Sequence, residues 1–184
     1  MSMSDEFKPT LLVSMPQLQD PNFARAVVLL CDYVPDGAFG LVLNRPTDMA
    51  ASTMVKLEPA VIGGNELRLC IGGPVEPQRG WILLADPPEE ADYRTICEGV
   101  YLSTSPQLLR RVLSRSPAPR ARVLAGYAGW GPGQLDFELA QSAWLIGNVD
   151  IDLVFDIEPE QMWETAIRRL GADPSALQMS HGVH

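Results

Sequence analysis

The stretch Gly126-Tyr-Ala-Gly-Trp-Gly-Pro-Gly-Gln-Leu-Asp-Phe-Glu-Leu-Ala-Gln-Ser-Ala-Trp144 gathers four glycines and two tryptophans. Glycine marks backbone that bends sharply or is closely approached by another group. The pattern predicts a strand that runs into a glycine loop, followed by a short helix over about 133–141. Two interpretations of the loop stay open: a tight structural corner, or a surface whose backbone N–H groups face a ligand.

The glycine loop matches neither of two common phosphate-binding motifs. Residues 129–133 read G-x-G-x-G with Pro132 inserted, whereas a dinucleotide fingerprint is G-x-G-x-x-G. A P-loop needs Lys followed by Ser or Thr, and Gln134 and Leu135 stand there. Because Asp136 already places a negative charge in the first helical turn, the helix dipole is satisfied internally, which favours the structural corner.

Runs rich in Val, Ile and Leu, bounded by Pro, Gly or Asp, predict strands before and after this stretch. They cover 11–14, 26–33, 38–43, 68–71, 81–85, 99–103 and 122–126. Turn signals at 35–37 and 72–77 predict two hairpins, the first joining 26–33 to 38–43 and the second joining 68–71 to 81–85. The sheet should therefore be antiparallel or mixed.

Two helices have clear boundaries. Ser105 is a suitable N-cap for a helix that begins at Pro106. A final helix opens at Pro159, carries an apolar face that includes Trp163, and stops at Gly171. Strands and helices that do not alternate strictly predict an α+β fold, and 184 residues suit one domain.

Charge is distributed unevenly. The net charge of −9 disfavours direct DNA binding, yet 99–135 holds five arginines and no acidic residue. Arg110, Arg111 and Arg115 fall mainly on one side of the helix that begins at Pro106. This basic patch is either a solvated helix face or a contact for an anion, RNA or protein. The acidic loop 86–92 is a complement that suggests docking between subunits or with a protein partner.

The residues of common catalytic centres are missing from the central sequence. The only histidines are His181 and His184, so a Ser–His–Asp or Cys–His mechanism has no base within the expected core. The three cysteines lack zinc-ligand spacing. Carboxylates over 150–160 match a calcium loop only at its first two positions, which favours an acidic loop leading into a helix. We therefore expect no cofactor and no metal, and favour a binding protein over an enzyme.

The same sequence predicts a soluble cytoplasmic protein. An odd number of scattered cysteines fits a reducing compartment, with Cys31 and Cys70 buried in apolar runs. Asp5 and Glu6 stand where a signal peptide would be basic, and no apolar run is long enough for a membrane span.

Several short motifs occur in a fixed order along the chain. They are Leu11–Pro16, Asp20–Phe23, Gly40–Pro46, Gly72–Val75, Arg79-Gly80 and Gly126–Leu135, with Trp144, Phe155-Asp156 and Trp163 after them. Together they resemble the bacterial YqgE/AlgH family over residues 11 to about 175. This leaves 1–10 as an N-terminal extension and 176–184 as a C-terminal tail.

The resemblance implies a single α+β domain with a curved, partly barrel-like sheet decorated by helices, in the bacterial cytosol. Some members are labelled as candidate transcriptional regulators because of a role in alginate production. The family brings no established catalytic residues. Any regulation by this acidic chain would more readily run through a protein partner or a small ligand than through DNA.

Polar and glycine positions at strand ends within these motifs are the candidate ligand or partner surface. They are Asn44, Arg45, Gly72, Gly73, Arg79, Tyr127, Gly129, Trp130, Gly131, Gly133 and Gln134. Arginines beside backbone N–H groups can hold a carboxylate or phosphate, although buried structural pairing, for instance of Arg79 with an acidic neighbour, is an alternative. The leading prediction is a non-enzymatic protein- or ligand-binding module with a regulatory role. The alternative is an enzyme or sensor for a small anionic or nucleotide-like ligand at the glycine loop.

Overall fold

Strand β9 (Ala121–Trp130) is the centre of the molecule, because three other strands pair with it. It runs antiparallel to β6 (Val75–Leu84) and β3 (Gly37–Val42) and parallel to β5 (Arg68–Ile71). The computed structural model describes residues 7–18 and 20–175. The expected tail 176–184, with both histidines, and the first six residues of the expected extension lie outside the described residues.

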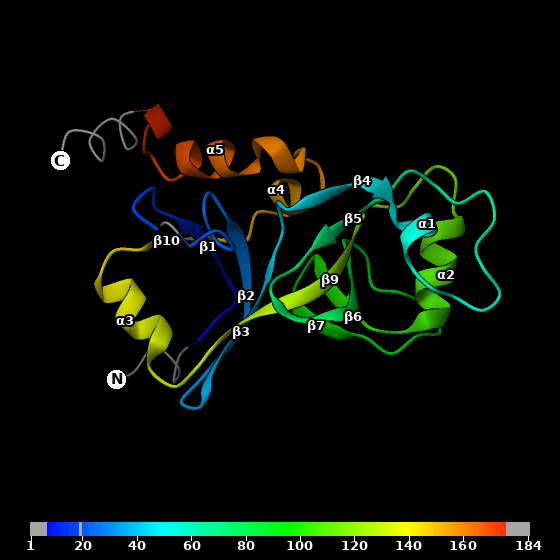
Figure 1. Cartoon of the computed structure of the whole chain (residues 1–184), viewed down its shortest axis with the longest axis horizontal. Helices are drawn as coiled ribbons and strands as arrows, with labels where there is room; N and C mark the ends of the chain where they lie inside the picture. The colour runs from blue at the N-terminus through cyan, green and yellow to red at the C-terminus, as the bar shows by residue number, and fades with distance from the viewer. Residues whose placement is uncertain (1–6, 19, 176–184) are drawn as a thin grey trace.

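The strands form one curled sheet in the order β10-β1-β2-β3-β9-β6-β8-β7, with β5 and β4 joined beside β9 (Figure 1). The remaining strands are β1 (Thr10–Ser14), β2 (Val27–Val34), β4 (Pro46–Ala50), β7 (Arg94–Cys97), β8 (Val100–Ser103) and β10 (Trp144–Gly147). The helices are α1 (Ala51–Met54), α2 (Pro106–Ser114), α3 (Gln134–Ala140), α4 (Ile151–Phe155) and α5 (Pro159–Arg169). This confirms the predicted α+β class and single curved sheet.

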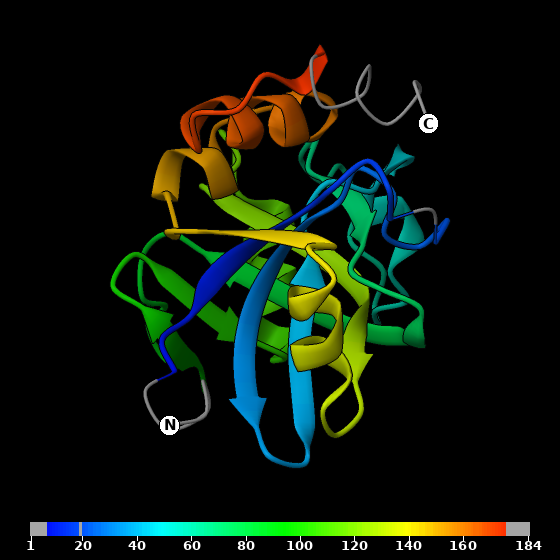
Figure 2. The same cartoon turned by 90° about the vertical axis from the view of Figure 1, so that its left-hand side faces the viewer.

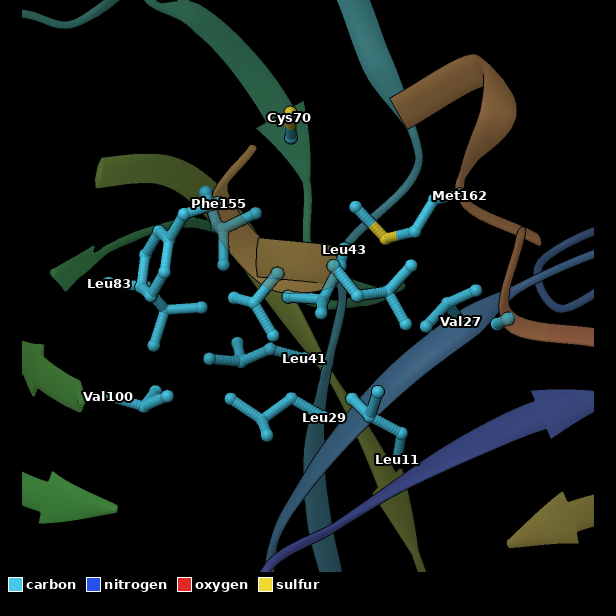
Figure 3. Packing of buried hydrophobic residues seen from close by; sticks show 14 of the residues in the cluster. Leu11, Val27, Leu29, Leu41, Leu43, Cys70, Leu83, Val100, Phe155 and Met162 are labelled. Atoms are coloured by element: carbon cyan, nitrogen blue, oxygen red, sulfur yellow. The ribbon is translucent and has the colours of Figure 1, made fainter. Parts of the chain in front are cut away.

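Both faces of the sheet are covered at β2, which explains why residues 27–31 of this strand are all apolar and buried. Successive side chains of a strand point to opposite faces. In β2, Val27 and Leu29 therefore enter one hydrophobic cluster while Val28 and Leu30 enter another. Figure 3 shows side chains of the first cluster, to which β2 contributes Val27 and Leu29 and α5 contributes Met162.

Helices cover the sheet on separate sides. Helix α3 lies over β3, in front of the sheet in Figure 2, and α4 and α5 cover the first cluster. Helices α1 and α2 lie at the end of the molecule opposite α3 (Figure 1). Within residues 7–18 and 20–175, no helix combines the length and the apolar character that crossing a membrane requires.

Helix boundaries follow the capping signals. The Ser105 hydroxyl accepts a hydrogen bond from the backbone N–H of Leu108 at 3.2 Å, and Pro106 begins α2. Helix α5 begins at Pro159 and ends just before Gly171. Both predictions are confirmed.

One predicted hairpin is confirmed and the other is wrong. Strands β2 and β3 pair around the turn at Val34 and Gly37. The second predicted hairpin fails because β5 and β6 do not pair with each other. Instead β9 lies between them, parallel to β5 and antiparallel to β6. Residues 72–77 do turn the chain, but the turn carries it across β9 instead of bringing β5 and β6 together.

The first strand of the glycine stretch is longer than expected. Strand β9 continues through Gly126 to Trp130, so the loop is confined to residues 131–133. Strands β4, β7 and β10 and helices α1 and α4 were not anticipated. Each has only four or five residues, too few for a periodic pattern to stand out.

The crossing of the β5–β6 connection over β9 requires glycine on both chains. A Cβ at Gly73 would lie 2.1 Å from the backbone carbon of Tyr127, and a Cβ at Gly126 would lie 2.4 Å from the Gly73 carbonyl oxygen. Gly126 also has φ +79°, which side chains of L residues rarely adopt. The two backbones can therefore touch only because neither residue has a side chain.

Replacing Gly126 by Ala should lower the free energy of unfolding by about 3 kcal/mol, through backbone strain and the clash with Gly73. Urea unfolding followed by tryptophan fluorescence would measure the loss. Gly80→Ala is the matched control, because no atom lies within 4 Å of its added Cβ. Equal stability of the two variants would contradict the crossing constraint.

Candidate functional site

The structure distributes the candidate residues over three regions. Arg79 and Tyr127 line one cavity, Asn44, Arg45 and Gly73 line a second, and Gly131 and Gly133 line a third. The largest of the three, with a volume of about 610 Å³, is the one that holds Arg79 and Tyr127.

The glycine loop is held by its own side chains. The Gln134 side-chain oxygen accepts a hydrogen bond from the Gly131 N–H at 3.1 Å. The Glu138 carboxylate accepts from the indole N–H groups of Trp130 at 3.2 Å and Trp144 at 2.9 Å. Both indoles are buried in the cluster under α3. These contacts favour the structural-corner interpretation.

The Asn44 and Arg45 side chains fasten the chain before β2 to the end of β3. The Asn44 amide accepts from the Val27 N–H at 2.9 Å and donates to the Arg25 carbonyl at 2.8 Å. Arg45 donates to the Ala24 carbonyl, and burial lowers the pKa of its guanidinium. The Asn44 amide is therefore a structural link that both accepts from and donates to the backbone before and at the start of β2.

Arg110 and Arg111 of the basic patch on α2 also donate hydrogen bonds to backbone carbonyls of the fold. Arg110 donates to the Pro59 carbonyl, and Arg111 donates to the Glu89 carbonyl at 2.6 Å. The second contact joins α2 to the acidic loop 86–92 within one chain. Arg115 lies at the C-cap of α2, beside a groove between the helix and that loop.

The acidic cluster over 150–160 is occupied by arginines. Arg169 pairs with Asp150 and Asp152, Arg120 with Asp156, and Arg68 with Glu158 and Glu160. The Arg68 and Arg120 pairs link α5 and the end of α4 to the sheet, and the Arg169 pairs link α5 to α4. All of these pairs are largely exposed, so they add little to stability. Across the described part of the chain, no three His, Cys, Asp or Glu side chains are grouped as a metal ion requires.

The largest of these cavities lies inside the curl of the sheet, and we call it the aromatic cavity. Its walls come from β2, β3, β6, β7, β8 and β9 and from the loops before β7 and after β8. The lining residues are Asp32, Phe39, Arg79, Trp81, Asp92, Tyr93, Arg94, Leu102, Ser103, Thr104 and Tyr127.

Three rings from three adjacent strands pack together in the aromatic cavity. The ring centroid of Phe39 lies 5.2 Å from those of Trp81 and Tyr127, and the latter two are 6.2 Å apart, edge to face. Trp81 is only 7% exposed. Among the described residues, its indole N–H has no hydrogen-bond acceptor, an omission that costs about 1–3 kcal/mol.

A large bulge in β6 forms the rim of the aromatic cavity. Val75 pairs with Tyr127 and Gly80 with Ala125, so the residues over 76–79 leave the ladder. Bulges often lie at barrel rims and next to binding sites, where they redirect side chains. Here the bulge places Arg79 4.6 Å from the centroid of the Trp81 ring.

Glu76 occupies the bulge in a strained conformation. Its φ of +46° is unusual for a residue with a side chain and costs of order 1–3 kcal/mol. Its carboxylate lies 3.6 Å from the Arg79 guanidinium. A hydrogen bond to Glu76 raises the pKa of the Tyr127 hydroxyl, because the bond stabilises the neutral phenol. Arg79 thus has an acidic neighbour, but the pair is about half exposed and not the buried structural pair that was predicted as the alternative.

An ion pair closes the far side of the aromatic cavity. Arg94 of β7 donates to both carboxylate oxygens of Asp32 in β2, at 2.8 and 2.6 Å, and to the Cys31 carbonyl at 3.1 Å. The sheet order separates β7 from β2 by four strands, so the pair joins strands that meet only because the sheet curls. The hydrogen bond to Asp32 raises the pKa of Arg94.

The thiol beside this ion pair is not activated. Burial raises the pKa of Cys31 to about 12, so the group stays protonated at physiological pH. Cys31 and Cys70 are both buried, as predicted.

Sequence reasoning found Arg79 and Tyr127 but missed Phe39, Trp81 and the Asp32–Arg94 pair. Phe39 lay in a hairpin and Trp81 in a buried strand, and either is ordinary core by pattern. The tryptophan two residues after Arg79 was the one available signal, because alternate strand residues share a face.

Comparison with known protein families identifies the family of this chain. The AlgH-like family model matches residues 11–175. The chain belongs to the AlgH-like family. Over 178 residues it is 39% identical to a UPF0301 protein of Myxococcus xanthus, covering 96% of this chain and 97% of that protein. A UPF0301 protein of Laribacter hongkongensis is 38% identical over 177 residues, covering 93% and 94% of the two chains.

Solved structures of similar proteins share the architecture. The solution structure of the AlgH protein from Pseudomonas aeruginosa is 32% identical with a TM-score of 0.73, over 92% of this chain and 91% of that one. A crystal structure from Corynebacterium diphtheriae, 22% identical, has a TM-score of 0.68 over 94% and 90% of the two chains. The second shows the fold alone. The YqgE/AlgH resemblance is therefore confirmed.

Replacing Glu138 by Ala should lower the free energy of unfolding by about 2 kcal/mol, because two buried indole N–H groups lose their acceptor. Thermal and urea unfolding would measure this. Phe137→Ala on the same helix should change stability by less than about 0.5 kcal/mol, since Phe137 is 65% exposed. A neutral Glu138→Ala would contradict the structural role of the stretch.

Proposed function

We propose that this AlgH-like protein is a binding module for a small, flat organic molecule held in the aromatic cavity. The observation that carries the proposal is the buried Trp81 N–H, which lacks an acceptor in the described structure beside two packed rings. Ligand sites are typically apolar and aromatic cavities with a few well-placed polar groups, and barrel mouths are a common location. A regulatory role would then act through occupancy of the cavity.

The size and chemistry of the cavity support this proposal. About 610 Å³ is within the range that small-molecule sites usually span. The rings supply a stacking surface, and the indole supplies one oriented donor. A ligand acceptor at Trp81 would recover the free energy that the unpaired N–H costs the empty protein.

Binding is supported over chemistry by the state of the surrounding groups. The Arg94 guanidinium is committed to Asp32 and the Cys31 carbonyl. The Tyr127 hydroxyl has a raised pKa, and a general base or nucleophile would need the opposite shift. These groups are suited to holding a ligand in place.

Naphthalene-2-carboxamide, a flat neutral probe with one carbonyl acceptor, should bind the wild-type protein. At 100 times its dissociation constant it should add about 2.7 kcal/mol of stability, which thermal unfolding would detect. Trp81→Phe keeps an aromatic ring but removes the N–H, so calorimetric titration should show affinity lowered by about five- to tenfold.

Phe23→Leu is the control, because Phe23 stacks on Trp130 in the other cluster and is not among the cavity-lining residues. It should leave the affinity unchanged. Absence of binding to wild type, or equal affinity in wild type and Trp81→Phe, would remove the support for this function.

A further inference from the structure

The Glu76 carboxylate lies in the β6 bulge, next to Arg79 of the aromatic cavity. Glu76 lies beside two groups that point to anion recognition, the Arg79 guanidinium and the Tyr127 hydroxyl. The side chains of Glu76 and Arg79 are 55% and 51% exposed, and their closest charged atoms are 3.6 Å apart. A pair this open and this long is weak, so a better-placed anion can replace it.

The donor residues near Glu76 come from two neighbouring strands that line the cavity. Arg79 and Trp81 are two residues apart on β6, and Tyr127 is on the neighbouring strand β9. The Trp81 N–H is the buried donor without an acceptor in residues 7–18 and 20–175. Arg79 and Tyr127, which both interact with Glu76, can therefore donate to a single acidic group.

The other charges of the cavity do not cancel this arrangement. Asp32 is neutralised by two hydrogen bonds from Arg94. Asp92 is exposed and belongs to the loop before β7, whereas the three donors belong to β6 and β9.

We propose that the ligand of the aromatic cavity is a flat anion whose carboxylate or phosphate replaces Glu76 on Arg79 and Tyr127. The inference rests on the proposed function, because it names the chemical class that the same cavity selects. Glu76 acts as an internal competitor: it holds the two donors in position when the cavity is empty and swings outward when a ligand arrives.

The two rim residues should therefore have opposite effects on binding. Calorimetric titration at low ionic strength would compare naphthalene-2-carboxylate with the isosteric, neutral naphthalene-2-carboxamide. The wild type should bind the carboxylate at least about tenfold more tightly. Glu76→Gln should tighten carboxylate binding by about three- to tenfold and leave carboxamide binding unchanged. Arg79→Gln should abolish the preference for the carboxylate.

The chain offers a matched control for both variants. Arg25 lies 4.4 Å from the ring centroid of Trp163 and 3.1 Å from Glu164, which repeats the arrangement of arginine, tryptophan and glutamate away from the cavity lining. Arg25→Gln and Glu164→Gln change the net charge equally. Neither should alter the affinity for either probe. Equal shifts in affinity for both pairs of variants would show that the effect comes from net charge alone, and would overturn the proposal.

The outcomes separate this inference from the proposed function. If the carboxamide binds and the carboxylate binds no more tightly, the cavity is a ligand site but the anion proposal fails. If neither probe binds, the proposed function itself fails.

A third probe, 2-naphthyl phosphate, identifies the anion: tighter binding than the carboxylate would assign a phosphate ligand, and weaker binding would assign a carboxylate. The melting temperatures of Arg79→Gln and the wild type should agree. This would show that the variant loses its preference for the carboxylate without losing its fold.

Discussion

The contact between two backbones at Gly73 and Gly126 is the constraint on which the rest of the molecule depends. Any side chain at either residue would enter the opposite main chain. The crossing lets the β5–β6 connection pass over β9, so that β9 receives β5 on one edge and β6 on the other. It also fixes where β6 starts, and with it the position of the bulge that carries Arg79.

Much of the fold could be predicted from the sequence because its elements are locally encoded. The apolar run of β2, the cap at Ser105 and the glycine after α5 are each read within a few residues. The pairing of β5 could not be predicted in this way. A glycine-rich turn predicts a change of chain direction. Which strand then pairs with β5 depends on β9, which lies about 50 residues later in the chain. Short elements such as β10 depend on packing more than on local pattern.

The candidate site was predictable only in part. Glycines drew attention to the 126–144 stretch, yet the loop is closed by Gln134 and its tryptophans are held by Glu138. The aromatic cavity could not be predicted, because the bulge in β6 depends on strand register. Register is a property of two paired strands together. An unpartnered indole N–H likewise becomes visible only when its surroundings are known. The same residue types serve packing in one cluster and line a cavity in the other.

The four tryptophans allow the central claim to be tested in one spectrum. The indole N–H groups of Trp130, Trp144 and Trp163 donate to Glu138 or to the Ser14 carbonyl, whereas Trp81 has no acceptor among the described residues. The measurement is a nitrogen–proton correlation spectrum recorded while naphthalene-2-carboxylate is added. The account predicts a saturable downfield shift of the Trp81 N–H, with the other three unchanged. A stationary Trp81 signal, or equal movement of all four, would contradict it.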